Sequence, residues 1–191
     1  MSTKQNLNKL ADKIRMDFPD INRGGCCVFA ALVAKALQHY YPTRVVAFNS
    51  SPQFSIDEVR AKVTKNSCRE WDRNGIDFNH IVIEFTDPDD GDKVYHLDAN
   101  GVFIADGSIS SYLTQVKGHL TIKEACEIAS LPDGWNPEFN RNNIPKIDKI
   151  IKKHFGLPIS NRWSISSIQR TASGALDRMV KEYYHEQLIL S

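Results

Sequence analysis

The chain lacks three features that would each indicate another class of protein: a charge imbalance, a metal-binding spacing of cysteines and histidines, and a long apolar run. Its 24 basic and 23 acidic residues give a formal net charge of +1, so no global field recruits nucleic acid or a membrane surface. The four cysteines form no Cys-x-x-Cys pair and the six histidines form no His-x-x-x-His pair, which argues against a zinc site. We expect no metal and no cofactor.

Membrane spans and secretion signals are also missing. No apolar run is long enough to cross a bilayer, and the first 20 residues contain no apolar stretch of signal-peptide length. Cys26 and Cys27 are adjacent, and the chain is not small and cysteine-dense, so a disulfide framework is not favoured. These absences predict a protein of a reducing compartment, located in the cytoplasm and without a membrane partner.

The residues that are present predict helices and strands in a mixed order. Apolar residues recur at helical spacing over 7–18, and again from Phe29 to Tyr40 after the two cysteines. A β-branched run at 43–48 predicts a strand, Ser55 or Asp57 can cap a short helix to Thr64, and the polar segment 65–79 is expected to be a loop. Beyond Ser108 the pattern predicts a mainly helical region: helices over 110–116, 122–128, 144–155 and 165–183, with an irregular loop at 131–143.

Two strand-like runs, 79–85 and 93–98, flank a turn-rich linker and predict an antiparallel hairpin, with a third strand at 102–104. If Glu84 pairs with Val94, His80 faces Asp98 on the same side of the sheet. The linker contains Asp87, Asp89, Asp90 and Asp92 but no glutamate that would close a calcium loop, so a solvated hairpin tip is the better interpretation.

Cys26 stands at the start of the predicted helix, where unpaired backbone N–H groups and the helix dipole favour a thiolate. His80 at a strand start and Asp98 on the neighbouring strand complete the order that a thiol, imidazole and carboxylate triad requires. The histidine would take the thiol proton, and the aspartate would fix its tautomer. The backbone N–H of Cys26, with a loop donor such as Asn22, is the candidate oxyanion hole.

Several alternatives remain open from the residues alone. Asn100 could replace Asp98 as the orienting group, and His96 shares the predicted sheet face with His80. Cys27 is the weaker nucleophile candidate and is expected to pack in the core or at most to act as a redox partner. The positive helix residues Lys146, Lys149, Lys152, Lys153 and His154 are interpreted as a solvated face rather than a nucleic-acid surface.

At these residues the sequence resembles the transglutaminase-like branch of the papain-like cysteine enzyme superfamily. Gly24-Gly25-Cys26 followed by Phe29-Ala30, and Arg44-Val45-Val46 after Pro42, are similar to its Gly-x-Cys-x-x-Phe-Ala segment and following strand. His80-x-Val82-x-Glu84 resembles His-x-Trp-x-Glu, and Tyr95-His96-Leu97-Asp98 resembles the strand that ends in the family's aspartate. The resemblance covers about residues 24–104, with Val82 in place of the tryptophan and Ala99-Asn100 in place of Pro-Thr.

Together these observations predict an α+β, papain-like fold, with a catalytic core at 1–107 and a helical C-terminal extension at 108–191 packed on it. The expected function is thiol-dependent hydrolysis or acyl transfer at an amide or ester, of peptidase, amidase or deamidase type, through Cys26, His80 and Asp98. The substrate would be a protein, a peptide or a small amide. The alternative is a non-catalytic papain-like module that binds or regulates a partner protein. The apolar stripe of the C-terminal helix would, if exposed, form a homodimer or partner surface.

Overall fold

A computed structural model describes residues 2–63, 67–73, 78–105, 108–110, 112–130 and 137–158. The chain divides into two units, Met1–Pro158 and Ile159–Ser191. The second unit lies outside the described residues, and so do the helix expected at 165–183 and the homodimer surface assigned to it. The elements of the first unit are α1 (Thr3–Asp17), α2 (Cys26–Leu37), β1 (Thr43–Asn49), α3 (Ile56–Lys62), α4 (Cys68–Arg73), β2 (His80–Asp87), a 3₁₀ turn (Pro88–Asp90), β3 (Lys93–Asp98), β4 (Gly101–Ile104), β5 (Ser108–Ser110), β6 (Leu113–Gln115), α5 (Ile122–Ala129) and α6 (Pro137–Phe155).

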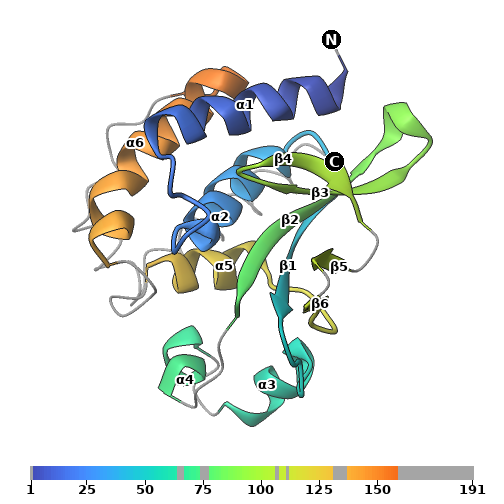
Figure 1. The fold of residues 1–191 in the computed structure, drawn as a ribbon, viewed down its shortest axis with the longest axis vertical. Coiled ribbons are helices and arrows are strands. Elements are labelled where there is room, and N and C mark those ends of the chain that lie inside the picture. The colour runs from blue at the N-terminus through green and yellow to red at the C-terminus, as the bar shows by residue number, and fades with distance from the viewer. Residues whose placement is uncertain are drawn as a thin grey trace, which may run out of the picture. The chain divides into compact units, whose positions relative to one another are not determined.

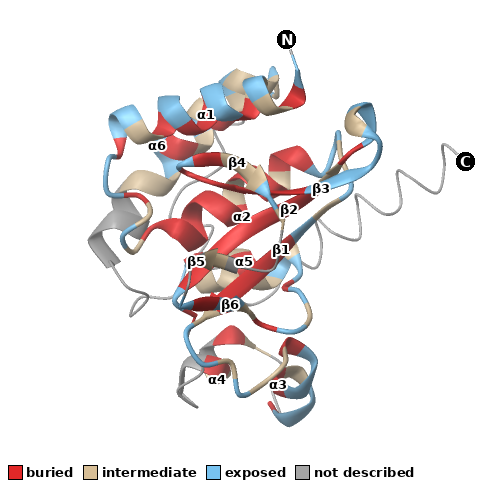
Figure 2. Ribbon diagram, turned by 45° about the vertical axis from the view of Figure 1, so that its right-hand side comes forward, coloured by how far each residue is buried: buried red, intermediate tan, exposed pale blue. Residues whose placement is uncertain are grey.

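The unit is α+β, with helices packed on one face of an antiparallel sheet (Figure 1). The strand order is β4-β3-β2-β1-β6-β5. Helix α2 contacts β1, β2 and β3 on its sheet side and α5 and α6 on its other side. It is therefore buried along most of its length, as Figure 2 shows.

Local sequence explains where the helices begin. The Ser2 side chain caps α1 by accepting a hydrogen bond from the Gln5 backbone N–H, and the Gln5 side chain accepts one from the Ser2 backbone N–H. Ser55 and Thr121 form the same reciprocal cap at α3 and α5. Helix α2 differs, because its N-cap is Gly25 and no side chain caps it. Its alanine-, valine- and leucine-rich sequence suits burial on all sides, and Phe29, 1% exposed, contributes about 2 kcal/mol by leaving water.

Alternate side chains of the strands point to opposite faces of the sheet, and the buried ones form two separate groups. Ile81, Ile83 and Phe85 of β2 join the core that contains α2. Val82 instead joins a smaller cluster with Val46, Phe48 and Leu113 on the opposite face. Because successive side chains of a strand point to opposite faces, His80 and Glu84 share the parity of Val82.

The register of the β2–β3 hairpin corrects the expected one. Glu84 pairs with His96 and not with the expected Val94, so the register is shifted by two residues. Continuing this register places Val82, not His80, opposite Asp98. Parity is kept, so His80 and Asp98 stay on one face and meet diagonally across the strands. The cause is the connection, where the Pro88–Asp90 turn and the left-handed Gly91 and Asp92 form a shorter reversal than expected.

Three other expectations are corrected. Helix α4 lies in the segment 65–79, which was expected to be a loop. Helix α6 begins at Pro137, within the loop expected at 131–143. Residues 131–136 of that loop lie outside the described residues. The helix expected over 110–116 is replaced by β5 and β6. Strand β6 pairs with the edge of β1 through Phe48–Gln115 and Asn49–Thr114. A short turn-rich segment therefore forms a strand here because the edge of β1 offers it hydrogen-bond partners.

The same pairing joins the part of the chain beyond residue 107 to the sheet. Strand β6 belongs to the sheet and α5 packs on α2, so the compact unit continues to Pro158. Among the described helices, none combines the length and the apolar composition that crossing a bilayer requires.

Candidate active site

Cys26 is the first residue of α2 and follows a tight turn. The Arg23 N–H donates to the Asp20 carbonyl at 2.7 Å, and Gly24 has a left-handed φ of 92°, a conformation that residues with a Cβ rarely adopt. Because Gly25 has no side chain to cap α2, Cys26 lies at the uncapped end of the helix, where the positive end of the helix dipole attracts a negative charge. The residue is 2% exposed, so the thiol is almost enclosed.

His80 is the first residue of β2, and its neighbour fixes the start of that strand. The Asn79 N–H donates to the Phe48 carbonyl at 2.9 Å, and the Asn79 side chain accepts from the Ser50 N–H at 2.8 Å. The His80 Nε2 atom lies 3.0 Å from Oδ2 of Asp98. The interactions that raise the His80 pKa include one with the Cys26 side chain, so the thiol lies beside the ring, and the Asp98 contact leaves Nδ1 as the ring nitrogen to face it.

Asp98 ends β3 and is 4% exposed, and donors surround its carboxylate. Oδ1 accepts from the Asn100 backbone N–H at 2.7 Å. Oδ2 faces His80 and also accepts longer bonds from the Asn22 side chain at 3.4 Å and the Asn100 side chain at 3.5 Å. Each of these contacts places a nitrogen against one of the two carboxylate oxygens.

The electrostatics of His80 follow from these contacts. Burial lowers the pKa of its imidazole, but the hydrogen bonds with Asp98 and Cys26 and the charges of both groups outweigh burial and raise the pKa to about 9. The ring is therefore an imidazolium at neutral pH. This cation lies beside the Cys26 side chain at the start of α2.

The two asparagines proposed from sequence take different places from those expected. The side-chain nitrogen of Asn22, expected in an oxyanion hole, is directed at Asp98. Asn100 was the alternative to Asp98 as the orienting residue. Its backbone N–H and its side-chain amide donate hydrogen bonds to Asp98, and no hydrogen bond among the described residues joins it to His80. Asp98 is thus the group that contacts the imidazole, and both asparagines contact Asp98.

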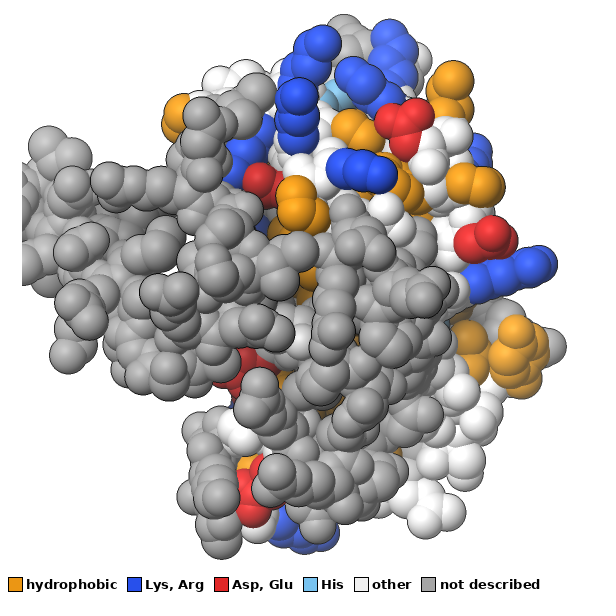
Figure 3. Space-filling model, turned by 90° about the vertical axis from the view of Figure 1, so that its left-hand side faces the viewer, with side chains coloured by type: hydrophobic (Ala, Val, Ile, Leu, Met, Phe, Trp, Pro, Cys, Tyr) orange, Lys and Arg blue, Asp and Glu red, His pale blue; other side chains and the backbone are white. Residues whose placement is uncertain are grey.

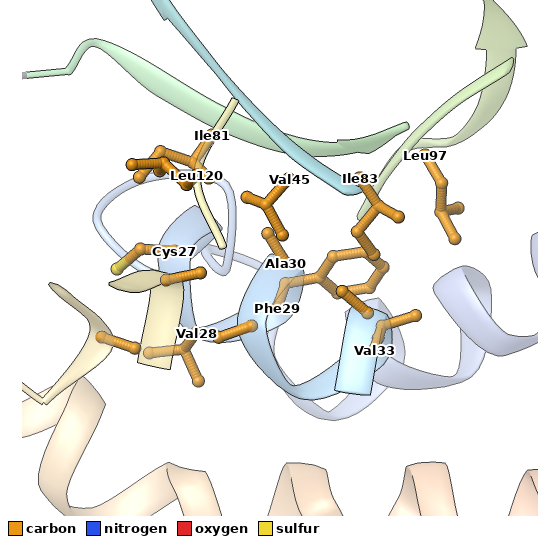
Figure 4. Close-up of a cluster of buried hydrophobic side chains, with 14 of the residues drawn as sticks. Cys27, Val28, Phe29, Ala30, Val33, Val45, Ile81, Ile83, Leu97 and Leu120 are labelled. Atoms are coloured by element: carbon orange, nitrogen blue, oxygen red, sulfur yellow. The ribbon is translucent and has the colours of Figure 1, made fainter. Parts of the chain in front are cut away.

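The other three cysteines lie in different surroundings. Cys27 belongs to the apolar cluster of Figure 4, with Ile81 and Leu120 among its members. Burial, and then the charge of Cys26, raise the pKa of Cys27 to about 12. Burial also raises the pKa values of Cys68 and Cys126. All four cysteines are free, and Cys26 is the one beside the His80 imidazole.

His96, the competing histidine, belongs to a second cluster of charges. Its Nε2 lies 3.2 Å from Oε2 of Glu84, whose other oxygen accepts from Arg44. The ring is fully buried between Phe48 and Phe103, with centroid distances of 5.6 Å to each. The register explains this row, since Arg44, Glu84 and His96 are directly paired on β1, β2 and β3. Sequence parity alone could not distinguish His96 from His80.

The acidic hairpin tip is paired with lysines. Asp90 accepts from Lys4 and Lys93, each at 3.0 Å, and from the Tyr95 hydroxyl; the hydrogen bonds from Tyr95, Lys93 and Lys4 lower the Asp90 pKa. In the described part of the chain, no group of three His, Cys, Asp or Glu side chains is arranged to hold a metal ion.

Lysine and arginine side chains gather on the face of α1 and α6 that is visible in Figure 3. Lys9 and Lys13 of α1 and Lys146, Lys149 and Lys153 of α6 are exposed. Lys152 is paired with Asp148 at 2.6 Å.

Two surface cavities have volumes of about 440 and 200 Å³, and Tyr41 lines both of them. Tyr41 follows the C-terminal end of α2, whereas Cys26 is at the opposite end of that helix.

Searches with protein-family models, with curated proteins and with solved structures found nothing that matches this chain.

Proposed function

We propose that the protein is a thiol-dependent hydrolase or acyltransferase that acts on an amide or ester bond. The observation that carries the proposal is a single imidazole, that of His80, shared between the Asp98 carboxylate and the Cys26 thiol. These residues lie far apart in sequence and come from a helix start, a strand start and a strand end. A thiol, an imidazole and a carboxylate in this order are the groups that nucleophilic acyl chemistry requires.

The reaction follows from the charges of the three groups. The Cys26 thiolate attacks the carbonyl carbon, and the resulting oxyanion is stabilised by N–H groups of the uncapped first turn of α2. His80 then donates its proton to the leaving nitrogen or oxygen as the C–N or C–O bond breaks, which leaves a thioester. Neutral His80 next takes a proton from water or an amine, which attacks the thioester. Cys26 leaves with its bonding electron pair and the imidazolium is restored, so protons balance over the cycle.

Asp98 remains a carboxylate throughout this cycle. It fixes the ring so that Nε2 faces the carboxylate and Nδ1 faces the thiol, and its charge stabilises the imidazolium. Water as the acceptor gives hydrolysis, which we take as the default reaction. An amine in the same position gives acyl transfer.

The papain-like assignment is part of the proposal. It is supported by α2 packed on an antiparallel sheet, with the cysteine at the helix start and the histidine and aspartate on adjacent strands. Val82 replaces the tryptophan of the resembled motif and lies in an apolar cluster with Val46 and Phe48. The replacement leaves the three triad residues in place and alters only their surroundings.

The test is covalent labelling of Cys26 by iodoacetamide at neutral pH, followed by peptide mass spectrometry. Labelling that is faster at Cys26 than at Cys126, and that is lost on replacing His80 by Gln, supports the proposal. Cys26→Ala should abolish hydrolysis of an ester probe while the far-ultraviolet circular dichroism stays unchanged. Cys27→Ala is the matched control and should retain the hydrolysis. Loss of activity in Cys27→Ala, with Cys26→Ala still active, would contradict the assignment.

One observation favours a second candidate, a non-catalytic module that binds or regulates a partner protein. Cys26 is 2% exposed and His80 is 8% exposed, and neither of the two cavities described above is lined by them. A substrate must therefore displace whatever covers the thiol. A binding module predicts that Cys26→Ala leaves the biological effect unchanged, whereas the enzyme predicts that this effect is lost without unfolding.

A further inference from the structure

The Asp98 carboxylate is held on both oxygens by groups outside the three residues of the triad. The Asn100 backbone N–H holds Oδ1, and the Asn22 side chain contacts Oδ2, the oxygen that also faces His80. Resting on the proposed function, we propose that Asn22 is a positioning residue that fixes Asp98 against His80, and is not a donor of the oxyanion hole.

The place of Asn22 in the chain gives this contact its importance. Asn22 lies in the turn that leads into α2, four residues before Cys26. Asp98 is the last residue of β3. The 3.4 Å contact therefore joins the segment that carries the nucleophile to the strand that carries the carboxylate.

The orientation of the Asn22 amide is set by Asp98. Its Oδ1 atom is buried and accepts no hydrogen bond from any described residue. Rotating the amide by 180° would place that oxygen against the Asp98 carboxylate, where two acceptors repel each other. A buried acceptor without a donor is unfavourable, so the bond from Nδ2 to Asp98 is the contact that selects this orientation.

A carboxylate fixed in this way also fixes the imidazole. With Oδ1 held by Asn100 and Oδ2 approached by Asn22, the plane of the carboxylate is defined, and so is the direction from which His80 Nε2 can bind. The ring is then directed so that Nδ1 is the nitrogen left to face the thiol. Asn22 acts through Asp98 and touches neither the thiol nor the imidazole in any recorded bond.

Two replacements in the full chain test this role. Asn22→Leu removes the donor at similar volume, and Asn22→Asp keeps the shape while it places a second carboxylate against Asp98. The first readout is the titration and tautomer of the His80 ring by side-chain ¹⁵N NMR, which needs no turnover. The second is kcat and KM for hydrolysis of p-nitrophenyl acetate across pH. Gln38→Leu, which removes a surface amide bonded to the Lys35 carbonyl, is the matched control.

We expect Asn22→Leu to lower kcat about 10-fold with little change in KM, and to change the tautomer ratio that the neutral His80 ring shows at high pH, because one charge-assisted hydrogen bond to Asp98 is lost. Asn22→Asp should raise the His80 pKa, since a second negative charge stabilises the imidazolium, and should lower kcat further. If Asn22→Leu does not fold, Asn22→Ser, whose hydroxyl is too short to reach Asp98, tests the same loss.

Two results would overturn the positioning role. Lower kcat in Asn22→Leu with the His80 titration and tautomer unchanged would assign Asn22 to the oxyanion hole. Unchanged kcat and an unchanged His80 titration in both variants would show that Asn22 does not position Asp98. Failure of the proposed function is distinguishable from both, because wild-type protein would then show no Cys26-dependent hydrolysis while the His80 titration still reports on Asn22.

Discussion

Replacing Asp98 by Asn is a nearly isosteric change with a large expected effect. Every group recorded against this carboxylate is a donor: His80 Nε2, the Asn22 amide, and the backbone N–H and amide of Asn100. The replacement removes the negative charge and converts one of two acceptor oxygens into a donor that faces other donors. The variant should therefore lose both the charge and part of the geometry that it provides.

The size of the effect follows from the His80 pKa of about 9. An imidazole ordinarily titrates near 6.5, and at about 1.4 kcal/mol for each pH unit the difference corresponds to roughly 3 kcal/mol in favour of the imidazolium. Burial opposes this stabilisation, and the Asp98 hydrogen bond is the largest contribution that raises the pKa. We expect Asp98→Asn to return the His80 pKa to about 6.5 or below and to slow turnover by ~100-fold or more.

The sign of the stability change is fixed by the direction of the shift. Because the folded-state pKa of His80 is raised, the stabilisation is fully present below pH ~6.5 and is lost as pH rises through about 9. The difference in unfolding free energy between wild type and Asp98→Asn should be about 2–3 kcal/mol near pH 6 and should shrink by pH 9.5. Urea denaturation at pH 6, 7.5 and 9.5, with NMR titration of His80, measures both quantities. A variant whose His80 titrates as in wild type, with a pH-independent stability difference, would refute the reasoning.

Four further predictions follow from the same contacts. Turnover of an amide probe by wild type should decline as pH rises through about 9, where His80 loses the proton that it gives to the leaving group; a rate still rising at pH 10 would contradict that role. Glu84→Gln should destabilise the fold by about 1–3 kcal/mol in chemical denaturation, because it weakens the buried bond to His96, yet leave the His80 titration unchanged. Gly101→Ala should destabilise by at least ~1 kcal/mol in thermal unfolding, since φ is 117° and a Cβ would lie 2.6 Å from the Asn8 side-chain oxygen; an unchanged melting temperature would argue against that close approach. Cys26 should react several-fold faster with N-ethylmaleimide than with a bulky maleimide that carries the same reactive group, whereas Cys126, half-buried, should discriminate less; equal rates at Cys26 would show that its burial does not restrict access.

Apart from α4, the order of elements from α1 to β4 could be predicted because each has a strong local signal. The spacing of Leu7, Leu10, Ala11 and Ile14 marks α1, and all four are buried. Pro42 after α2 and the β-branched run of β1 set the next boundary. The start of α2 at Cys26, and the alternation that places His80 and Asp98 on one face, follow from the sequence in the same way.

Features that depend on tertiary contacts could not be predicted. The hairpin register follows from turn geometry that Asp87 to Asp92 do not uniquely specify, and a shift of two residues preserves the hydrophobic pattern. Strand β6 is a strand because β1 offers it an edge, not because of its own composition. The contact of Asn22 with Asp98 spans 76 positions, and no spacing in the sequence indicates it.

The central claim is that His80 activates Cys26, and the rate of Cys26 alkylation in wild type and in His80→Gln tests it most directly. Peptide mass spectrometry after timed exposure to iodoacetamide at pH 7 gives both rates, with Cys126 as the internal reference. The account predicts that wild-type Cys26 reacts at least ~10-fold faster than in His80→Gln, while Cys126 reacts equally in both. Equal rates at Cys26 in the two folded proteins would contradict it.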